Sequence, residues 1–368
     1  MPSHSSLFLE VLQAALGTRR TLSRIPSAAE WDDIYEQARR HCLRAFFLQA
    51  FERDGGQWGD RHGLPLDLKL RWLGKGAKCA DTNRRLDAQC LQLSAKLTQS
   101  GYWNCLLKGQ GVARLYPHPE WREAGDIDIW VDGGRHRLVG MVRRVTGRRA
   151  PVTYHHTDFP VFPRTHVELH FTPTWMFNPW RNRALQHWFR AHRQSHPADD
   201  RFPMPVPTDE FNLLYLLLHI FRHVFDEGIG LRQLVDYFHA LGRGRAACPP
   251  SSSLDAKMRP LLRRFGLLRF AGGLMWVMEQ ALGLPRELEI AEPDERVGAW
   301  LLEDILSGGN FGHFSPERRS ADHVRRADRL WWRLRLSLRR VRLFPGEALW
   351  EMPWRVWHFL WRWRHGYL

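Results

Sequence analysis

The chain has 368 residues, of which 44% are hydrophobic and 12% aromatic. This composition supports a folded core and argues against an intrinsically disordered chain, and the length favours two or three subdomains. Lysine and arginine outnumber aspartate and glutamate by 54 to 39, which gives a net charge of +15. The surplus favours an anionic partner such as a nucleotide, a nucleic acid or a lipid surface. A compositional bias toward arginine would produce the same surplus without any function.

The five cysteines are scattered along the chain and form no Cys-x-x-Cys pair. This pattern argues against a disulfide framework and a cysteine zinc site, and it fits a reducing compartment. The first apolar stretch contains the acidic Glu10 and has no basic segment ahead of it, so we expect no signal peptide. The sequence contains no uninterrupted run of about 18 apolar residues, so we expect no membrane-spanning helix. We therefore expect a cytoplasmic protein, either soluble or bound peripherally to a membrane.

Apolar residues at helical spacing predict an N-terminal helical region over residues 1–100. Over residues 101–175 the pattern changes to short apolar runs that alternate with turns, which is typical of a small sheet. The expected strands are Cys105–Leu107, Ile127–Val131, Val152–His155, Phe159–Phe162 and Val167–Phe171. Helix-length segments at Gly109–Tyr116 and Arg135–Val145 lie between them.

Residues 176–368 are predicted to be helical again and to end in a basic, tryptophan-rich tail. The expected helices are Thr208–Phe225, Leu231–Leu241, a helical stretch near Leu254–Leu282, and Val297–Leu306. A Gly/Arg/Pro/Ser-rich segment, Gly242–Ser253, is predicted to be a linker. The protein is therefore expected to be α/β or α+β, with a small sheet flanked by N-terminal and C-terminal helical regions.

The tail interleaves arginine with tryptophan, leucine and phenylalanine over Arg325–Leu343 and Trp350–Arg364. Four tryptophans of the second segment, Trp350, Trp354, Trp357 and Trp361, share one helical face. One interpretation is an amphipathic basic helix that docks on an anionic membrane surface or nucleic acid. The other, which is the more common role of such a stripe, is that the tryptophan face packs on the body of the protein.

The sheet region carries two aspartates, Asp126 and Asp128, on an otherwise apolar strand. Side chains at positions i and i+2 of a strand point to the same face, so both carboxylates lie together. Like charges repel at this distance, and a divalent cation would compensate them. Glu168, on a later apolar strand, would complete a three-carboxylate cluster able to hold one or two Mg²⁺ ions.

A basic residue and a glycine, Lys108 and Gly109, end the strand that precedes the aspartates. Backbone N–H groups at the start of a helix, with a glycine that permits close approach, suit a phosphate. Arg122 adds positive charge shortly before Asp126. Together these residues predict a site for Mg²⁺-dependent chemistry on a phosphate substrate.

These motifs, in this order, resemble a known family. They are Leu107-Lys108-Gly109, Leu115-Tyr116-Pro117, Arg122-x-x-Gly125-Asp126-Ile127-Asp128, Glu168-Leu169-His170, His219-x-x-x-His223 and the segment Gly228–Asp236. In this combination the chain resembles the bacterial family of uncharacterised nucleotidyltransferases of the NTP_transf_5 type, which belongs to the nucleotidyltransferase superfamily shared with DNA polymerase beta. The resemblance covers roughly Tyr102 to Leu241.

The resemblance implies an α+β fold with a small mixed, nucleotidyltransferase-type sheet. It also implies an enzyme that transfers a nucleotidyl group from an NTP, ATP above all, to a hydroxyl acceptor that the motifs do not identify. It implies catalytic, Mg²⁺-binding carboxylates at Asp126, Asp128 and Glu168, with Glu168 alternatively accepting the proton of the attacking hydroxyl. It implies nucleotide contacts at Lys108, Gly109, Arg122 and Gly125.

One position departs from the superfamily pattern, because Gln110 stands where a serine usually follows the glycine. This departure leaves open a non-catalytic nucleotide- or nucleic-acid-binding protein with a degenerate fold. The Trp/Arg tail leaves open a second alternative, a peripheral membrane protein linked to the assembly of surface polysaccharide.

Several histidines are further candidates. His170 follows Glu168 by two residues and should share its face, which makes it a candidate for contacting substrate. His219 and His223 share a helical face, a spacing that permits zinc, but more often such residues line a cleft and bond neighbours or substrate. The neighbours expected for them are Arg232 and Asp236, which are themselves candidates for substrate binding.

His155, His156 and Asp158 also look like a ligand cluster. They fall at a predicted hairpin tip, where polar side chains need no functional cause.

Overall fold

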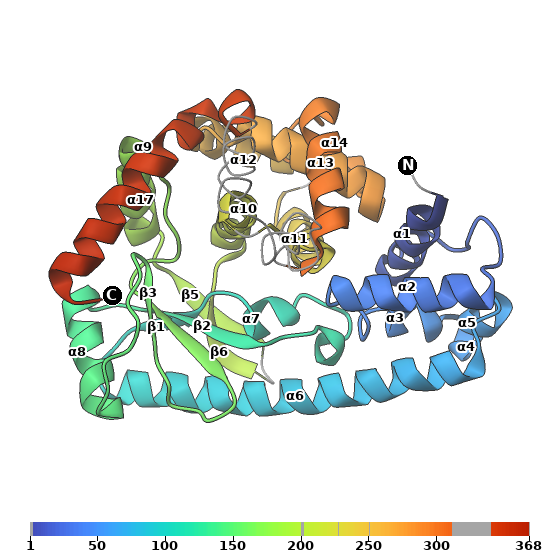
Figure 1. The fold of residues 1–368 in the computed structure, drawn as a ribbon, viewed down its shortest axis with the longest axis horizontal. Helices are drawn as coiled ribbons and strands as arrows, with labels where there is room; N and C mark the ends of the chain where they lie inside the picture. The colour runs from blue at the N-terminus through green and yellow to red at the C-terminus, as the bar shows by residue number, and fades with distance from the viewer. Residues whose placement is uncertain (1–2, 200–201, 227, 250, 311–339, 368) are drawn as a thin grey trace, which may run out of the picture. The chain divides into compact units, whose positions relative to one another are not determined.

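The structure is a computed structural model that describes residues 3–199, 202–226, 228–249, 251–310 and 340–367 (Figure 1). The protein is α+β, as the sequence predicts, with a small mixed sheet and helices toward both ends of the chain. It falls into two compact units. The first unit takes Met1–Thr82, His118–Glu123 and His219–Leu336, and the second takes Asn83–Pro117, Ala124–Leu218 and Ser337–Leu368, as far as these are described.

The first unit is built from helices. Its N-terminal part contains α1 (Ser3–Leu16), α2 (Ala28–Arg40), the one-turn helices α3 (Leu48–Phe51), α4 (Arg53–Gly56) and α5 (Trp58–Arg61), and the start of α6 (Leu66–Gln99). Helix α2 begins at a capping box, because Ser27 and Glu30 each bond the other's backbone N–H group. Such a box satisfies donors that a helix start otherwise leaves without partners.

The C-terminal helices of the first unit confirm most of the predicted pattern. They are the end of α10 (Asp209–Asp226), then α11 (Leu231–Ala246), α12 (Leu254–Phe265), α13 (Leu268–Leu282) and α14 (Glu295–Gly308). One detail was wrong, because α11 continues through the first residues of the expected linker. The helical stretch 254–282 consists of two helices, since Gly266 adopts φ +66° and ends α12.

The second unit contains a four-stranded sheet with the order β1-β2-β4-β3. Its strands are β1 (Asn104–Leu106), β2 (Asp126–Val131), β3 (His156–Asp158) and β4 (His166–His170). Strands β2 and β4 run parallel, whereas β1 pairs antiparallel with β2 and β3 antiparallel with β4. Helix α8 (Arg135–Thr146), predicted from the sequence, follows β2.

One face of this sheet forms the core of the second unit. Ile127, Ile129 and Leu169 point to it from β2 and β4 and are buried. They pack with the last turns of α6 and with α8, through residues that include Leu86, Cys90, Leu93, Leu97, Leu138 and Met141. Because side chains alternate along a strand, the intervening residues of β2 and β4 point to the opposite face, and that face is polar.

The strand predictions were partly wrong. Strand β3 lies later than expected, and Val152 forms only an isolated bridge to Thr157. The segment Phe159–Phe162 is not a strand, since only Phe162 bridges, to Thr165. The expected helix at Gly109–Tyr116 is the single turn α7 (Gln110–Ala113).

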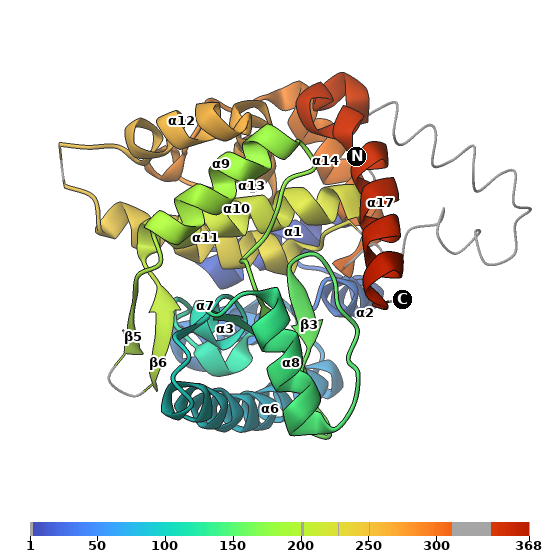
Figure 2. The same ribbon diagram turned by 90° about the vertical axis from the view of Figure 1, so that its left-hand side faces the viewer.

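The region after residue 176 also contains a hairpin that was not expected, β5 (Ser195–Asp199) with β6 (Phe202–Pro207) (Figure 2). Three prolines in β6 hid the strand, because proline cannot donate to a ladder and is confined to edges. The signal was the alternation of Phe202, Met204 and Val206, which join the core of the sheet.

Two further helices complete the second unit: α9 (Pro179–Ala191) and α17 (Pro345–His365). The predicted tail segment Arg325–Leu343 lies almost entirely outside the described residues. Within the described ranges, no helix combines the length and the apolar character needed to cross a membrane.

The core face of the sheet should tolerate truncation poorly. Ile129 is 0% exposed, so Ile129→Ala should lower the free energy of unfolding by about 2–5 kcal/mol, through lost burial and the cavity that remains. The matched control is Val145→Ala on α8, where the side chain is 62% exposed and a change within about 0.5 kcal/mol is expected. Chemical denaturation measures both, and equal losses would contradict this assignment of the core.

Candidate active site

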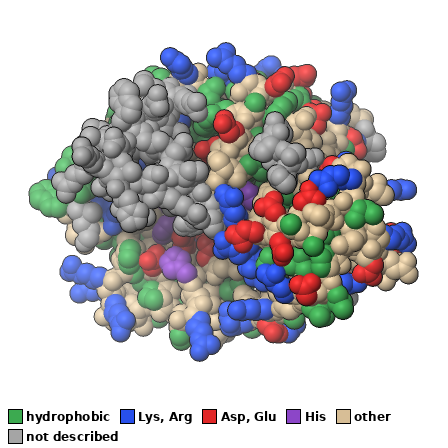
Figure 3. Space-filling model, turned by 45° about the vertical axis from the view of Figure 1, so that its right-hand side comes forward, with side chains coloured by type: hydrophobic (Ala, Val, Ile, Leu, Met, Phe, Trp, Pro, Cys, Tyr) green, Lys and Arg blue, Asp and Glu red, His purple; other side chains and the backbone are tan. Residues whose placement is uncertain are grey.

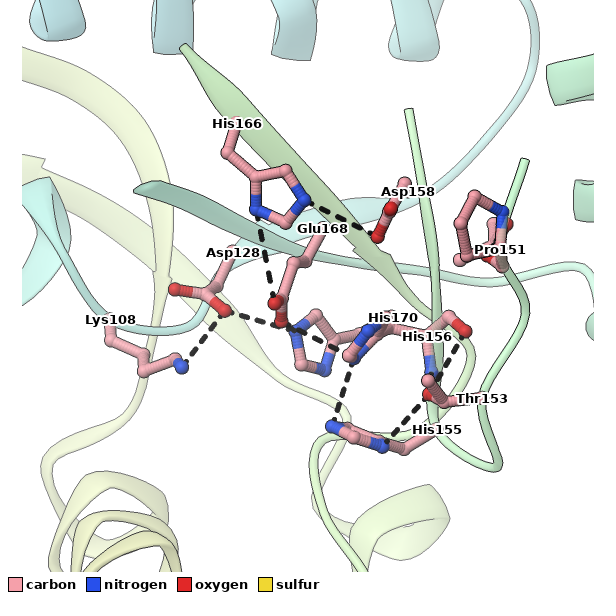
Figure 4. A network of polar contacts seen from close by, with 11 residues as sticks. Lys108, Asp128, Pro151, Thr153, His155, His156, Asp158, His166, Glu168 and His170 are labelled. Carbon is pink, nitrogen blue, oxygen red and sulfur yellow. Dashed lines mark hydrogen bonds and ion pairs between the residues drawn. The ribbon is translucent and has the colours of Figure 1, made fainter. Parts of the chain in front are cut away.

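The polar face of the sheet brings together acidic and histidine side chains from three strands (Figure 4). Asp128 on β2 lies opposite Glu168 on β4, and Glu168 lies opposite Asp158 on β3. In the same way His156 on β3 lies opposite His170 on β4. Side chains at paired positions point to the same face, so the strand register alone gathers this cluster.

Asp128 is the centre of the cluster and is only 1% exposed. Its Oδ1 atom accepts from the Lys108 ammonium at 2.9 Å and lies 3.1 Å from Nε2 of His170. Lys108 reaches it because β1 ends beside β2, where the backbone N–H of Leu107 donates to the Asp128 carbonyl at 2.9 Å. A buried carboxylate is costly unless it is paired and hydrogen-bonded, and here two nitrogen groups pair with it.

Glu168 shares one of these partners. Its Oε2 atom lies 3.2 Å from His170 Nε2 and 3.3 Å from His156 Nδ1, and its Oε1 atom lies 4.0 Å from His166. His170 therefore lies between the two carboxylates, and its second ring nitrogen, Nδ1, is buried without a hydrogen-bond partner.

These contacts shift the pKa values of the groups in the cluster. Burial alone would lower the pKa of His170, but the hydrogen bonds to Asp128 and Glu168 outweigh it and raise this pKa to about 9. Burial alone would raise the pKa of Glu168, yet His170 and Lys108 hold it well below its usual range. Burial lowers the pKa of His156 to about 4, so this side chain is neutral at neutral pH.

The pKa of Lys108 is also shifted. Burial alone would lower this pKa. The negative charges of Asp128 and the neighbouring carboxylates together outweigh burial and raise it. Lys108 is therefore a permanent positive charge at this end of the sheet.

Two groups of side chains are close enough to hold a cation. Asp128, Glu168 and His170 each offer a ligand atom, and these atoms lie within 4.8 Å of one another. The same is true of His155, His156 and His170. Asp126 lies on the same face of β2 as Asp128, but it belongs to neither of these groups of described residues. His170, rather than a third carboxylate, completes the acidic group.

The family model of uncharacterised nucleotidyltransferases matches residues 27–283, which is more than half of the chain. The protein belongs to this family. No curated protein matches it. Among solved structures, the chain is similar to the crystal structure of an antigenic nucleotidyltransferase-like protein from Paracoccidioides brasiliensis, with 15% sequence identity and a TM-score of 0.34. That match covers 58% of this chain and 95% of the other.

The Lys-Gly turn of this family member differs in detail from the expectation. Gly109 has φ +59°, and a Cβ atom there would lie 3.2 Å from the backbone oxygen of Asp126, so the glycine is required by the approach of the turn to β2. Gln110 is buried and its amide donates to Asp87 Oδ1 on α6 at 2.6 Å. It therefore does not replace the hydroxyl of the usual serine. Gly125 is exposed, and a side chain there would meet no atom within 4 Å.

The remaining candidates lie in the first unit. Arg122 forms a buried, bidentate ion pair with Asp236, in which Nε to Oδ1 is 2.7 Å and Nη2 to Oδ2 is 2.8 Å. Arg232 donates to the carbonyl of Glu123 at 2.8 Å. His219 and His223 contact one another on α10 with their ring centroids 4.3 Å apart. The structure thus brings Arg122 and Asp236 together, a pairing that the sequence did not indicate.

A cavity of about 560 Å³ lies in the second unit, between α9 and α17, and sequence reasoning missed it. Its lining includes Tyr154, Phe177, Asn182, Gln186, Trp350 and Trp354. Trp354 stacks on Trp175 at 5.5 Å, and Trp175 contacts the His155 ring at 4.2 Å, so an aromatic wall connects the cavity with the histidines. The spacing of the tryptophans along the sequence was the signal for this packing. The structure confirms that the tryptophan face packs on the body of the protein, although Trp357 stays 46% exposed.

From the sequence, His155 and His156 were interpreted as polar residues at a hairpin tip without a functional role. The tip folds back against β4, so their rings lie 5.1 and 5.4 Å from that of His170. No local pattern predicts this contact, since it depends on the pairing of β3 with β4.

The raised pKa of His170 predicts how stability depends on pH in the metal-free protein. Because the folded-state pKa is about 9 and the ordinary value is about 6.5, the stabilisation is complete below pH 6.5 and is lost as pH rises through 9. The loss should approach about 3 kcal/mol, at roughly 1.4 kcal/mol per unit of pKa. Urea denaturation from pH 6 to 9 measures it. The decrease in the free energy of unfolding with rising pH should vanish in His170→Gln. It should persist in the control His187→Gln, because the His187 side chain is exposed on α9. A decrease that remains in His170→Gln would contradict the assignment.

Proposed function

We propose that this protein is an Mg²⁺-dependent nucleotidyltransferase that transfers a nucleotidyl group from an NTP to a hydroxyl acceptor, with pyrophosphate as the leaving group. The observation that carries the proposal is the in-register pair Asp128 and Glu168, whose ligand atoms converge within 4.8 Å beside the Lys108 ammonium. Membership of the nucleotidyltransferase family supports this assignment of the reaction class.

The donor atoms fit a magnesium ion. Mg²⁺ prefers oxygen ligands and is commonly held by one or two carboxylates together with substrate phosphates. Asp128 and Glu168 would hold it, and Asp126, on the same face of β2, would be a third carboxylate near it. The bound ion would supply positive charge against the charge that develops on the phosphate oxygens during transfer.

The protein's own groups would perform the remaining tasks. Lys108 supplies a fixed positive charge for the triphosphate, at the turn where Gly109 lets the backbone pass close to β2. The low pKa of Glu168 favours its role as a ligand over that of a proton acceptor, because an efficient general base has a pKa near the working pH. Arg122 and Asp236 satisfy one another in the first unit, so we leave both out of the proposed nucleotide site.

The cavity between α9 and α17 is the proposed acceptor site. Its volume of about 560 Å³ falls within the range of small-molecule pockets, roughly 300–1,000 Å³. Aromatic walls and the amides of Asn182 and Gln186 suit an acceptor with a flat face and several hydrogen-bonding groups. The wall formed by Trp175 and Trp354 leads from this cavity toward the carboxylates.

Substitution of either carboxylate tests the reaction. With α-labelled NTPs, Mg²⁺ and cell extract as the source of acceptor, label should be transferred by the wild type and reduced at least about 10²-fold in Asp128→Asn and Glu168→Gln. γ-Labelled NTPs should leave the acceptor unlabelled. Asp132→Asn is the matched control, since Asp132 follows β2 and is exposed.

Two outcomes would contradict the proposal. Transfer of the γ-phosphate would indicate a different reaction class. Nucleotide binding without any transfer, unchanged by either substitution, would favour the non-catalytic alternative.

A second candidate function rests on the outer face of α17. Six apolar side chains of this helix are more than half exposed: Leu349, Met352, Val356, Phe359, Leu360 and Trp363. At about 100° per residue they fall within one stripe of roughly 100°, and arginines such as Arg355 and Arg364 flank it. We propose that this stripe docks on an anionic membrane, because exposed apolar side chains beside basic ones match the interface of a charged bilayer.

The apolar character of the stripe favours a membrane over a nucleic acid as the partner, because nucleic-acid binding depends mainly on basic side chains that contact phosphates. On the face drawn in Figure 3, lysine and arginine side chains are interspersed with acidic ones.

Vesicle binding tests the α17 stripe. The double variant Val356→Asp/Leu360→Asp should lose most of the co-sedimentation with vesicles that contain anionic lipid, because it puts two charges into the apolar stripe. The matched control is Leu66→Asp/Leu70→Asp on α6, where two exposed leucines have the same spacing and similar exposure. Equal pelleting of the two variants would remove this candidate, as would binding to RNA in place of vesicles.

A further inference from the structure

The imidazoles beside the carboxylates form a separate constellation. One ring nitrogen of each of His155, His156 and His170 lies within 4.8 Å of the others. We infer that these three side chains bind a transition-metal cation such as Zn²⁺, at a site next to the carboxylate pair and chemically different from it. This inference does not depend on nucleotidyl transfer.

The first argument is the arrangement around His170, which is 2% exposed. Its Nε2 atom faces the oxygens of Asp128 and Glu168, while Nδ1 is buried without a hydrogen-bond partner. A buried polar atom without a partner is costly. Metal-binding histidines almost always give one ring N–H to a carboxylate and the other nitrogen to the metal, and His170 has the first half of this arrangement.

The second argument is the fixed position of the His155 ring. Its Nδ1 atom lies 3.3 Å from the hydroxyl oxygen of Thr153, and its Nε2 atom faces His156. The Trp175 ring packs against it at an interplanar angle of 38°, with ring centroids 4.2 Å apart, and helps to hold this orientation.

The third argument is a distance. Nε2 of His155 lies 3.0 Å from Nδ1 of His156 and forms a hydrogen bond with it in the metal-free protein (Figure 4). A bound Zn²⁺ would replace this hydrogen bond with little movement, because two nitrogens at about 2.0–2.1 Å from one tetrahedral ion are roughly 3.3 Å apart. Three imidazoles would leave the fourth tetrahedral position open to water or substrate, as catalytic zinc sites do.

The ligand chemistry separates the two groups that share His170. Imidazole nitrogens suit Zn²⁺, Co²⁺, Ni²⁺ and Cu²⁺, whereas carboxylate oxygens suit Mg²⁺ and Mn²⁺. Millimolar Mg²⁺ should therefore leave the imidazole site free for a micromolar transition metal.

Metal binding to the full-length protein tests the inference. After equilibrium dialysis against Zn²⁺ in excess Mg²⁺, the wild type should retain one Zn²⁺ more than the double variant His155→Ala/His156→Ala. Loss of a single ligand should weaken binding at least about tenfold, since loss of a group that merely orients a ligand already costs about 10- to 100-fold. Co²⁺ in place of Zn²⁺ should give a visible absorption spectrum of nitrogen-bound, four-coordinate metal.

The controls separate this site from adventitious binding. His187→Ala removes an exposed imidazole on α9 and should bind as the wild type does. Circular dichroism checks folding, and His155→Gln provides a milder variant if the double variant unfolds. Equal Zn²⁺ content and affinity in wild type and His155→Gln would overturn the inference. A Co²⁺ spectrum dominated by thiolate bands would do the same, because it would place the metal on cysteines.

Discussion

The structure of the candidate site depends on the compensation of two carboxylates that the sheet places side by side. The parallel register of β2 and β4 puts Asp128 opposite Glu168, and their repulsion and desolvation would oppose folding if nothing balanced them. Lys108 and His170 provide that balance with contacts of 2.9 to 3.2 Å. The end of β1 and the last residue of β4 are therefore fixed by electrostatics as much as by backbone pairing.

The same alternation along β2 serves packing and chemistry. Ile127 and Ile129 pack with α6 and α8, while Asp128 between them faces the polar side. A shift of one residue in register would exchange the two faces, so the core that stabilises the sheet also fixes the side on which the carboxylates appear. This coupling explains why so short a sheet can position a carboxylate, Asp128, that is almost fully buried.

Family motifs in this chain serve two different purposes. Lys108, Asp128 and Glu168 converge at the polar face of the sheet. Arg122 and Asp236 instead form a buried pair in the first unit, where removal of one partner would leave the other charge uncompensated. A basic residue that precedes the aspartates in sequence is thus explained by packing of the helical unit, and no phosphate is needed to account for it.

The sequence by itself determined the α+β class, the main helices, the strands that carry Asp128 and Glu168, and the family. These features are local, because periodicity and short motifs lie within a few residues of one another. Only the tertiary structure decided that His170 completes the acidic group in place of Asp126. It also decided that His155 and His156 lie close to His170, and that Trp354 lines a cavity. Each of these contacts joins segments whose meeting depends on strand pairing or helix docking, and no pattern along the chain encodes such long-range geometry.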